Sequence, residues 1–113
     1  MRWILAPALL LAACSKGPEA DLPSIGEARS LAAEWALVNE QASDGKLTRT
    51  YVSSMHRWLR EQLRSVSSSL QEPRSRYGQE IQALLRAPDD APPEELRAHA
   101  EALKRIEDAL ESA

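Results

Sequence analysis

Phenylalanine is absent from this chain of 113 residues, and the residues that usually fill β-sheet faces are scarce. Three Val, four Ile and two Thr are too few to provide the packed faces of a sheet. The single cysteine, Cys14, excludes an intrachain disulfide and any cysteine-based metal or redox pair. The composition therefore indicates a small all-α protein, and the length allows one domain at most.

A strong charge of one sign is also lacking, because 14 basic residues stand against 17 acidic ones. This balance excludes the strongly basic class of nucleic-acid-binding proteins. No H-E-x-x-H, G-x-S-x-G or phosphate-loop motif occurs, and His56 and His99 stand alone on the apolar sides of predicted helices. We therefore expect no enzyme, no catalytic or metal site, no cofactor and no small-molecule substrate.

No hydrophobic run is long enough to remain in a membrane as a spanning helix. Residues 3–13 form an uncharged, almost wholly apolar run of 11 after a basic start at Arg2, whereas a spanning helix needs about 20 such residues. A run of this length followed by small residues is typical of a secretory signal. The pattern predicts a signal peptide over residues 1–13.

The end of this run, Leu11-Ala12-Ala13-Cys14, resembles the lipobox of bacterial lipoproteins. The resemblance covers residues 1–14 only, and an ordinary signal peptide or a buried N-terminal helix is the alternative. It implies cleavage between Ala13 and Cys14, a diacylglycerol on the Cys14 thiol and, in most Gram-negative bacteria, an N-acyl chain such as palmitate. It further implies a lipid-anchored envelope protein. Because Ser15 replaces the Asp that marks inner-membrane retention in that family, the expected site is the outer membrane of a Gram-negative host.

Residues 14–23 are predicted to be the lipidated cysteine and a flexible tether, because two Pro and one Gly interrupt the chain there. Residues 24–113 form the predicted helical domain. Its first helix is expected to start at a capping box of Ser24 and Glu27 and to end at Asp44-Gly45. Its apolar stripe has helical spacing and consists of Ile25, Ala28, Leu31, Ala32, Trp35, Val38 and Ala42.

Three more amphipathic helices are predicted, over 48–71, 75–87 and 93–111. Pro73 ends the first of these, and Pro93 suits the first position of the last. Glu101 and Arg105 have the spacing of an i, i+4 ion pair. Short links between such helices predict a small antiparallel bundle of three to four helices. The inward residues of the three helices are Val52, Met55, Leu59, Leu63, Val66 and Leu70; Tyr77, Ile81, Leu84 and Leu85; and Leu96, His99, Leu103, Ile106 and Leu110.

Charge is unevenly distributed along the predicted domain. Residues 46–86 hold eight basic and three acidic side chains, whereas the segments on both sides are acidic. Arg49, Arg57, Arg60 and Arg64 fall within about 80° of one another on the helix predicted over 48–71. We call these four residues the arginine stripe. It is either a solvated face that pairs with acidic neighbours, or a surface for lipid phosphates, glycolipid phosphates or an acidic protein segment.

Two functions follow from these features. The first is a lipid-anchored adaptor that docks another envelope protein. The alternative is a structural lipoprotein that binds anionic lipid or cell wall directly through the arginine stripe. Trp35 and Trp58 lie on the apolar sides of their helices and are expected in the core, with an exposed aromatic anchor as the second interpretation.

Overall fold

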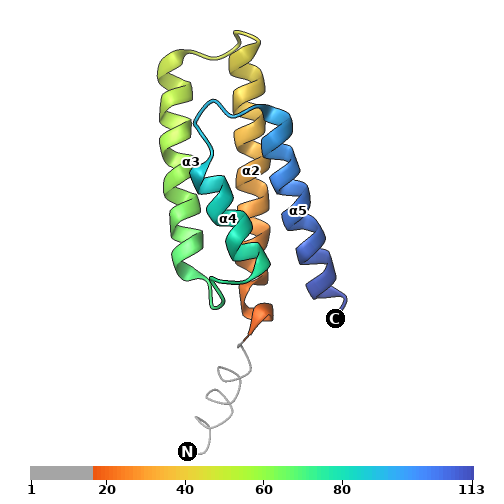
Figure 1. Ribbon diagram of the computed structural model, residues 1–113. Coiled ribbons are helices and arrows are strands. Elements are labelled where there is room, and N and C mark those ends of the chain that lie inside the picture. Colours follow the sequence, from red (N-terminus) through yellow and green to blue (C-terminus); the bar gives the residue numbers. More distant parts are fainter. Residues whose placement is uncertain (1–16) are drawn as a thin grey trace, which may run out of the picture.

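The computed structural model describes residues 17–113, so the predicted signal peptide and Cys14 lie outside the described residues. The described chain is a bundle of antiparallel helices, and no strand occurs in it (Figure 1). The predicted all-α class is confirmed. The elements are a short 3-10 helix η2 (Pro18–Asp21) and the α-helices α2 (Leu22–Ser43), α3 (Arg49–Ser69), α4 (Arg76–Arg86) and α5 (Pro93–Glu111).

Helix α2 lies at the centre of the bundle and packs along both α3 and α5 (Figure 1). The short helix α4 lies between α3 and α5 and covers only the half of the bundle nearest η2. We call the end that holds η2 the N-terminal end and the opposite end, at the α2–α3 turn, the far end. No helix within residues 17–113 is long and apolar enough to cross a bilayer.

Three of the predicted helix boundaries are confirmed by local hydrogen bonds or backbone geometry. The Thr48 hydroxyl accepts a bond from the Tyr51 N–H at 3.2 Å and caps α3. In the same way the Ser75 hydroxyl accepts from the Gly78 N–H at 3.1 Å and caps α4. Helix α2 ends before Gly45, whose φ of 72° is the left-handed conformation that glycine favours.

The start of α2 differs from the prediction. Its N-cap is Asp21 and the helix begins at Leu22, so the expected capping box of Ser24 and Glu27 is wrong. The predicted tether over 15–23 is helical from Pro18, which places the beginning of the folded body six residues before the expected boundary at 24.

Asp21 is the physical reason for this early start. It is only 1% exposed, and its carboxylate accepts from the backbone N–H groups of Gln71 (2.7 Å) and Glu72 (3.0 Å) and from the Tyr77 hydroxyl (2.6 Å). These bonds fix η2 against the α3–α4 connection. They also explain why α3 ends at Ser69 and not at 71, because the next N–H groups bind Asp21 instead of extending the helix.

The core is formed by the inward sides of all four α-helices, largely as their apolar spacing predicts. Trp35 is completely buried at its centre. The largest other fully buried apolar side chains are Ile25, Leu59, Leu63, Ile81, Leu84, Leu96 and Leu103.

Beyond the end of α4, segment 87–92, which contains a turn at Asp89 and Asp90, continues along the bundle toward the far end (Figure 1). Polar side chains of α2 bind its backbone. The Trp35 indole donates to the carbonyl of Asp89 at 2.9 Å, and the Asn39 amide donates to the carbonyls of Asp89 and Ala91, each at 2.9 Å. Asn39 Oδ1 can only accept, so His56 Nε2 donates the bond that joins them at 2.7 Å.

Candidate functional site

Three large hydrophobic side chains are substantially exposed in the described part of the chain. Leu37 of α2 is 52% exposed, and Tyr51 and Trp58 of α3 are 49% and 42% exposed. Tyr51 and Trp58 are seven residues apart, which is two helical turns, so they lie on the same side of α3. We call these three residues the α2–α3 patch.

Two contacts fix the register of α2 against α3. Asn39 is hydrogen-bonded to His56, and the guanidinium of Arg60 lies 5.0 Å from the ring centre of Trp35. Of these four residues, Trp35, Asn39 and Arg60 also bind backbone carbonyls between residues 85 and 91. This side of the helix pair therefore faces the chain that follows α4.

The α2–α3 patch lies on the opposite side. Leu37 is midway in sequence between Trp35 and Asn39 on α2. Trp58 is midway between His56 and Arg60 on α3. A displacement of two positions rotates a helical side chain by about 200°. Leu37 and Trp58 are therefore at the same level of the bundle, and both point away from segment 87–92.

The two tryptophans predicted in the core thus have different environments. Trp35 is buried, as expected, whereas the prediction of a buried Trp58 is wrong and the alternative of an exposed aromatic side chain is correct. Trp35 therefore offers no surface for docking in this fold.

Of the four residues of the arginine stripe, Arg60 is half-buried and the other three are exposed. Arg60 binds the Asp89 carboxylate at 2.6 Å and the carbonyls at the end of α4, so it holds segment 87–92 in place. Arg49, Arg57 and Arg64 are exposed, and among the described residues no carboxylate lies within ion-pair distance of them. The pairing expected of a solvated face applies to Arg60, and the other three remain open to a partner.

Each histidine has a polar partner from another helix. His56 is hydrogen-bonded to Asn39, and His99 of α5 pairs through Nδ1 with Glu80 of α4. Within residues 17–113, no group of three or more His, Cys, Asp or Glu side chains is placed to hold a metal ion.

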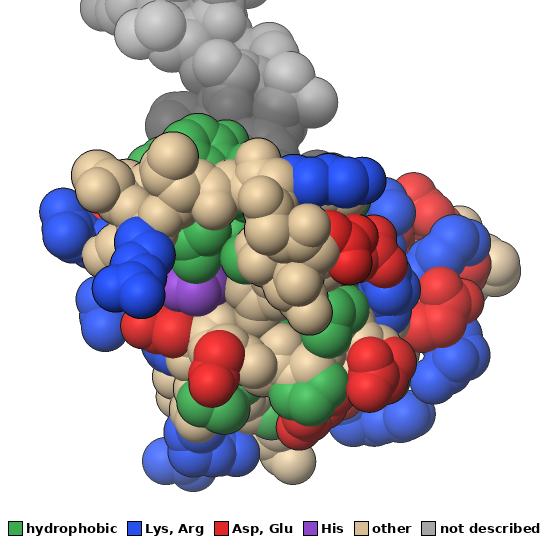
Figure 2. Space-filling view, turned by 90° about the horizontal axis from the view of Figure 1, so that it is seen from above, with side chains coloured by type: hydrophobic (Ala, Val, Ile, Leu, Met, Phe, Trp, Pro, Cys, Tyr) green, Lys and Arg blue, Asp and Glu red, His purple; other side chains and the backbone are tan. Residues whose placement is uncertain are grey.

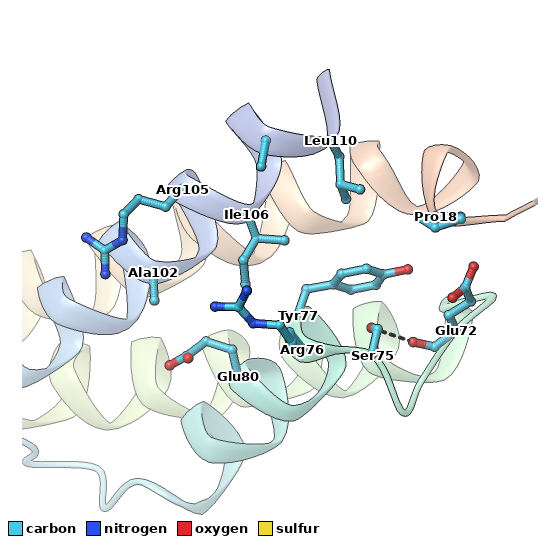
Figure 3. A pocket seen from close by; sticks show the side chains of 11 residues that line it. Pro18, Glu72, Ser75, Arg76, Tyr77, Glu80, Ala102, Arg105, Ile106 and Leu110 are labelled. Atoms are coloured by element: carbon cyan, nitrogen blue, oxygen red, sulfur yellow. Dashed lines mark hydrogen bonds between the residues drawn. The ribbon is translucent and has the colours of Figure 1, made fainter. Parts of the chain in front are cut away.

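A groove between α4 and α5 opens at the N-terminal end (Figure 3). Its volume is about 470 Å³, within the usual range for ligand sites. Tyr77, Ile106 and Leu110 line its apolar part, and Arg76 and Arg105 lie on its α4 and α5 sides. Sequence reasoning missed this groove, because an approach between helices cannot be read from the periodicity of either one.

Arg105 is available to the groove because its expected ion pair is absent. Glu101 and Arg105 are not within ion-pair distance, and the i, i+4 pair formed on α5 is that of Lys104 and Asp108 at 3.0 Å. Among the described residues, Arg76 is also outside ion-pair distance of any carboxylate.

The far end of the bundle has a mixed surface (Figure 2). Acidic and basic side chains are interspersed around this end, and hydrophobic side chains reach the surface between them. A shallow hollow there is lined by Ala42, Val52, His56 and Asp89 among others. This end therefore has no extended region of a single charge sign that would select a strongly charged ligand.

No protein-family model, no curated protein and no solved structure matches this chain.

Proposed function

We propose that this protein is a lipid-anchored, non-enzymatic adaptor of the bacterial envelope that docks another envelope protein through the α2–α3 patch. The observation that supports docking is that the exposed side chains of Leu37, Tyr51 and Trp58 lie on the same side of the bundle. Exposed aromatic side chains are frequent binding hot spots, because they bury a large area at a small cost in conformational entropy. The partner should present an apolar surface of matching size.

The anchoring part rests on the sequence pattern that ends at Cys14. Two or three acyl chains on this residue exceed what stable membrane attachment requires. The Cys14→Ser variant should accumulate as an uncleaved precursor without lipid, because the thioether must form before cleavage. Mass spectrometry of the N-terminal peptide and membrane fractionation measure both effects. A variant of normal processed size that stays in the membrane would contradict the lipobox assignment.

Photo-crosslinking in cells tests the docking part. A photoreactive residue at position 58 should give a discrete adduct with one envelope protein, and the same residue at position 65 serves as an exposed control on α3. Tyr51→Ser with Trp58→Ser should reduce co-purification of that partner by at least about 30-fold, since even one hot-spot residue contributes about 2 kcal/mol or more. No protein adduct at position 58 would contradict the adaptor proposal.

Direct binding to anionic lipid or cell wall is the second candidate. The observation that favours it is the absence of ion-pair partners for Arg49, Arg57 and Arg64 in the described chain. This function predicts an association that weakens strongly with salt and is lost when Arg57 and Arg64 are changed to Glu. Arg60 is excluded from this test, because its loss would also release segment 87–92.

A further inference from the structure

The α4–α5 groove lies very close to the proposed lipid anchor. Pro18 lines one end of the groove beside Leu110 (Figure 3). Cys14 is only four residues before Pro18, so even a fully extended chain places the two residues within about 14 Å of each other. If Cys14 is lipidated, the groove is therefore held at the surface of the bilayer.

The shape of the groove suits a single acyl chain. Its α5 wall extends from Ala102 to Leu110, which is a length of about 12 Å along the helix. The Tyr77 ring and the Ile106 side chain lie between these ends and make the interior apolar. This apolar part of the groove, at the end of the bundle that holds Pro18, fits a lipid tail.

The charges on the sides of the groove suit an anionic headgroup. Arg76 and Arg105 have no ion-pair partner in the described chain, and the planar guanidinium binds phosphate in bidentate fashion. Two carboxylates also line the groove. Glu80 is paired with His99, and Glu72 lies at the end near Pro18.

We infer that the α4–α5 groove binds one anionic phospholipid of the membrane in which Cys14 is anchored. The lipid tail lies along Tyr77 and Ile106, and the phosphate contacts Arg76 and Arg105. This inference rests on the proposed lipid anchor, and it gives the protein a fixed orientation. The groove turns toward the bilayer, so the α2–α3 patch on the other side of the bundle is left open to a protein partner.

Site-directed spin labelling of the lipidated protein in vesicles tests the inference. Because the Cys14 thiol is consumed by lipidation, one added cysteine is the only site for the label. We would place it at Ala109, an exposed residue at the edge of the groove, and as a control at Ser54 on α3. The label at 109 should be immersed in lipid when phosphatidylglycerol is added to phosphatidylcholine vesicles, and the label at 54 should stay in water.

Arg76→Gln with Arg105→Gln should lower the ratio of immersed to aqueous label at 109 about 30-fold, since each arginine near an anionic surface contributes about fivefold. Lys46→Gln with Arg86→Gln changes the net charge equally outside the groove and should leave this ratio unchanged. A label at 109 that stays in water, or that is immersed equally without phosphatidylglycerol, would overturn the inference.

Failure of the anchor itself is distinguishable in the same samples. A mass spectrum without acyl chains on Cys14 defeats the proposed anchor and the inference that depends on it. An acylated protein whose label at 109 remains aqueous defeats the groove inference alone.

Discussion

At the N-terminal end of the bundle α4 lies between α3 and α5, whereas toward the far end the chain continues as the non-helical segment 87–92. A helix satisfies its own backbone, so α4 needs only apolar contacts with its neighbours. A segment outside a helix has free carbonyls that must be paired when they are buried. Trp35 and Asn39 supply these donors from the middle of an otherwise apolar stripe.

The N-terminal end also has a buried polar contact, but the roles of donor and acceptor are reversed. There the buried group is an acceptor, the Asp21 carboxylate, and the free backbone groups are the N–H donors of Gln71 and Glu72. In each case a polar side chain is buried where a segment outside the helices packs against the bundle. No buried polar side-chain atom of the described residues lacks a hydrogen-bond partner.

The largest effect is expected at Asp21. The Asp21→Ala variant removes the acceptor of two backbone N–H groups and of the Tyr77 hydroxyl, and should lower the free energy of unfolding by about 3–5 kcal/mol. Urea denaturation followed by circular dichroism measures this loss. The exposed Glu19→Ala should change stability by no more than about 0.5 kcal/mol. A loss below about 1 kcal/mol for Asp21→Ala would show that these bonds do not hold the N-terminal end.

Asn39→Ala should have the next largest effect, at the far end. It leaves the carbonyl of Ala91 and the His56 ring without their partner, while the carbonyl of Asp89 keeps its bond from Trp35, and this should cost about 2–4 kcal/mol. Hydrogen exchange separates the two ends. The Ala91 N–H, which donates to Pro88, should exchange faster in this variant, while the Gln71 N–H is unchanged. Faster exchange at both ends would indicate one cooperative unit.

For Gly78→Ala, helix propensity and the packing of the bundle predict changes in stability of opposite sign. In an isolated helix this change should add up to about 1 kcal/mol of stability. In the bundle an added Cβ would overlap the carbonyl oxygen of Pro73, so we expect a loss of about 1–3 kcal/mol. Gly26→Ala is the matched control, because its Cβ would meet only the movable carboxylate of Glu107, at 2.8 Å. Thermal unfolding of both variants decides between the two signs.

The helices could be predicted because their signals are local. Thr48, Ser75 and Pro93 mark three helix starts through groups within one turn, and the apolar spacing identifies the core. The true start of α2 could not be predicted in this way. Its N-cap, Asp21, is buried by bonds to residues about 50 positions away, and these bonds outweigh the local pattern of a capping box.

The candidate surfaces were less predictable than the helices. Trp58 lies at the flank of an apolar stripe, and whether a flank is covered depends on the neighbouring helix. Arg60 shares its side of α3 with Arg64, but only Arg60 is within ion-pair distance of Asp89 in the segment after α4. The α4–α5 groove depends entirely on how two helices approach each other.

The smallest effect is expected for Tyr77→Phe, which removes one of the three bonds to Asp21. The carboxylate keeps its two backbone donors, so the loss at neutral pH should be about 1–2 kcal/mol. A more specific expectation concerns alkaline pH. Burial, together with the hydrogen bond to Asp21, raises the pKa of Tyr77 from 10.0 to about 12.

Because the folded state holds the phenolic proton more tightly than the unfolded chain, its contribution to stability is complete below pH 10 and is lost as the pH rises toward about 12. Tyr77→Phe lacks this proton. The difference in unfolding free energy between the parent protein and Tyr77→Phe should therefore be constant up to about pH 10 and then shrink. Losses from the alkaline titration of other groups are common to both proteins and cancel in this difference. Urea denaturation at a series of pH values measures this difference. A difference that stays constant up to pH 12 would contradict the raised pKa of Tyr77, and with it the burial of the hydroxyl beside the Asp21 carboxylate that causes it.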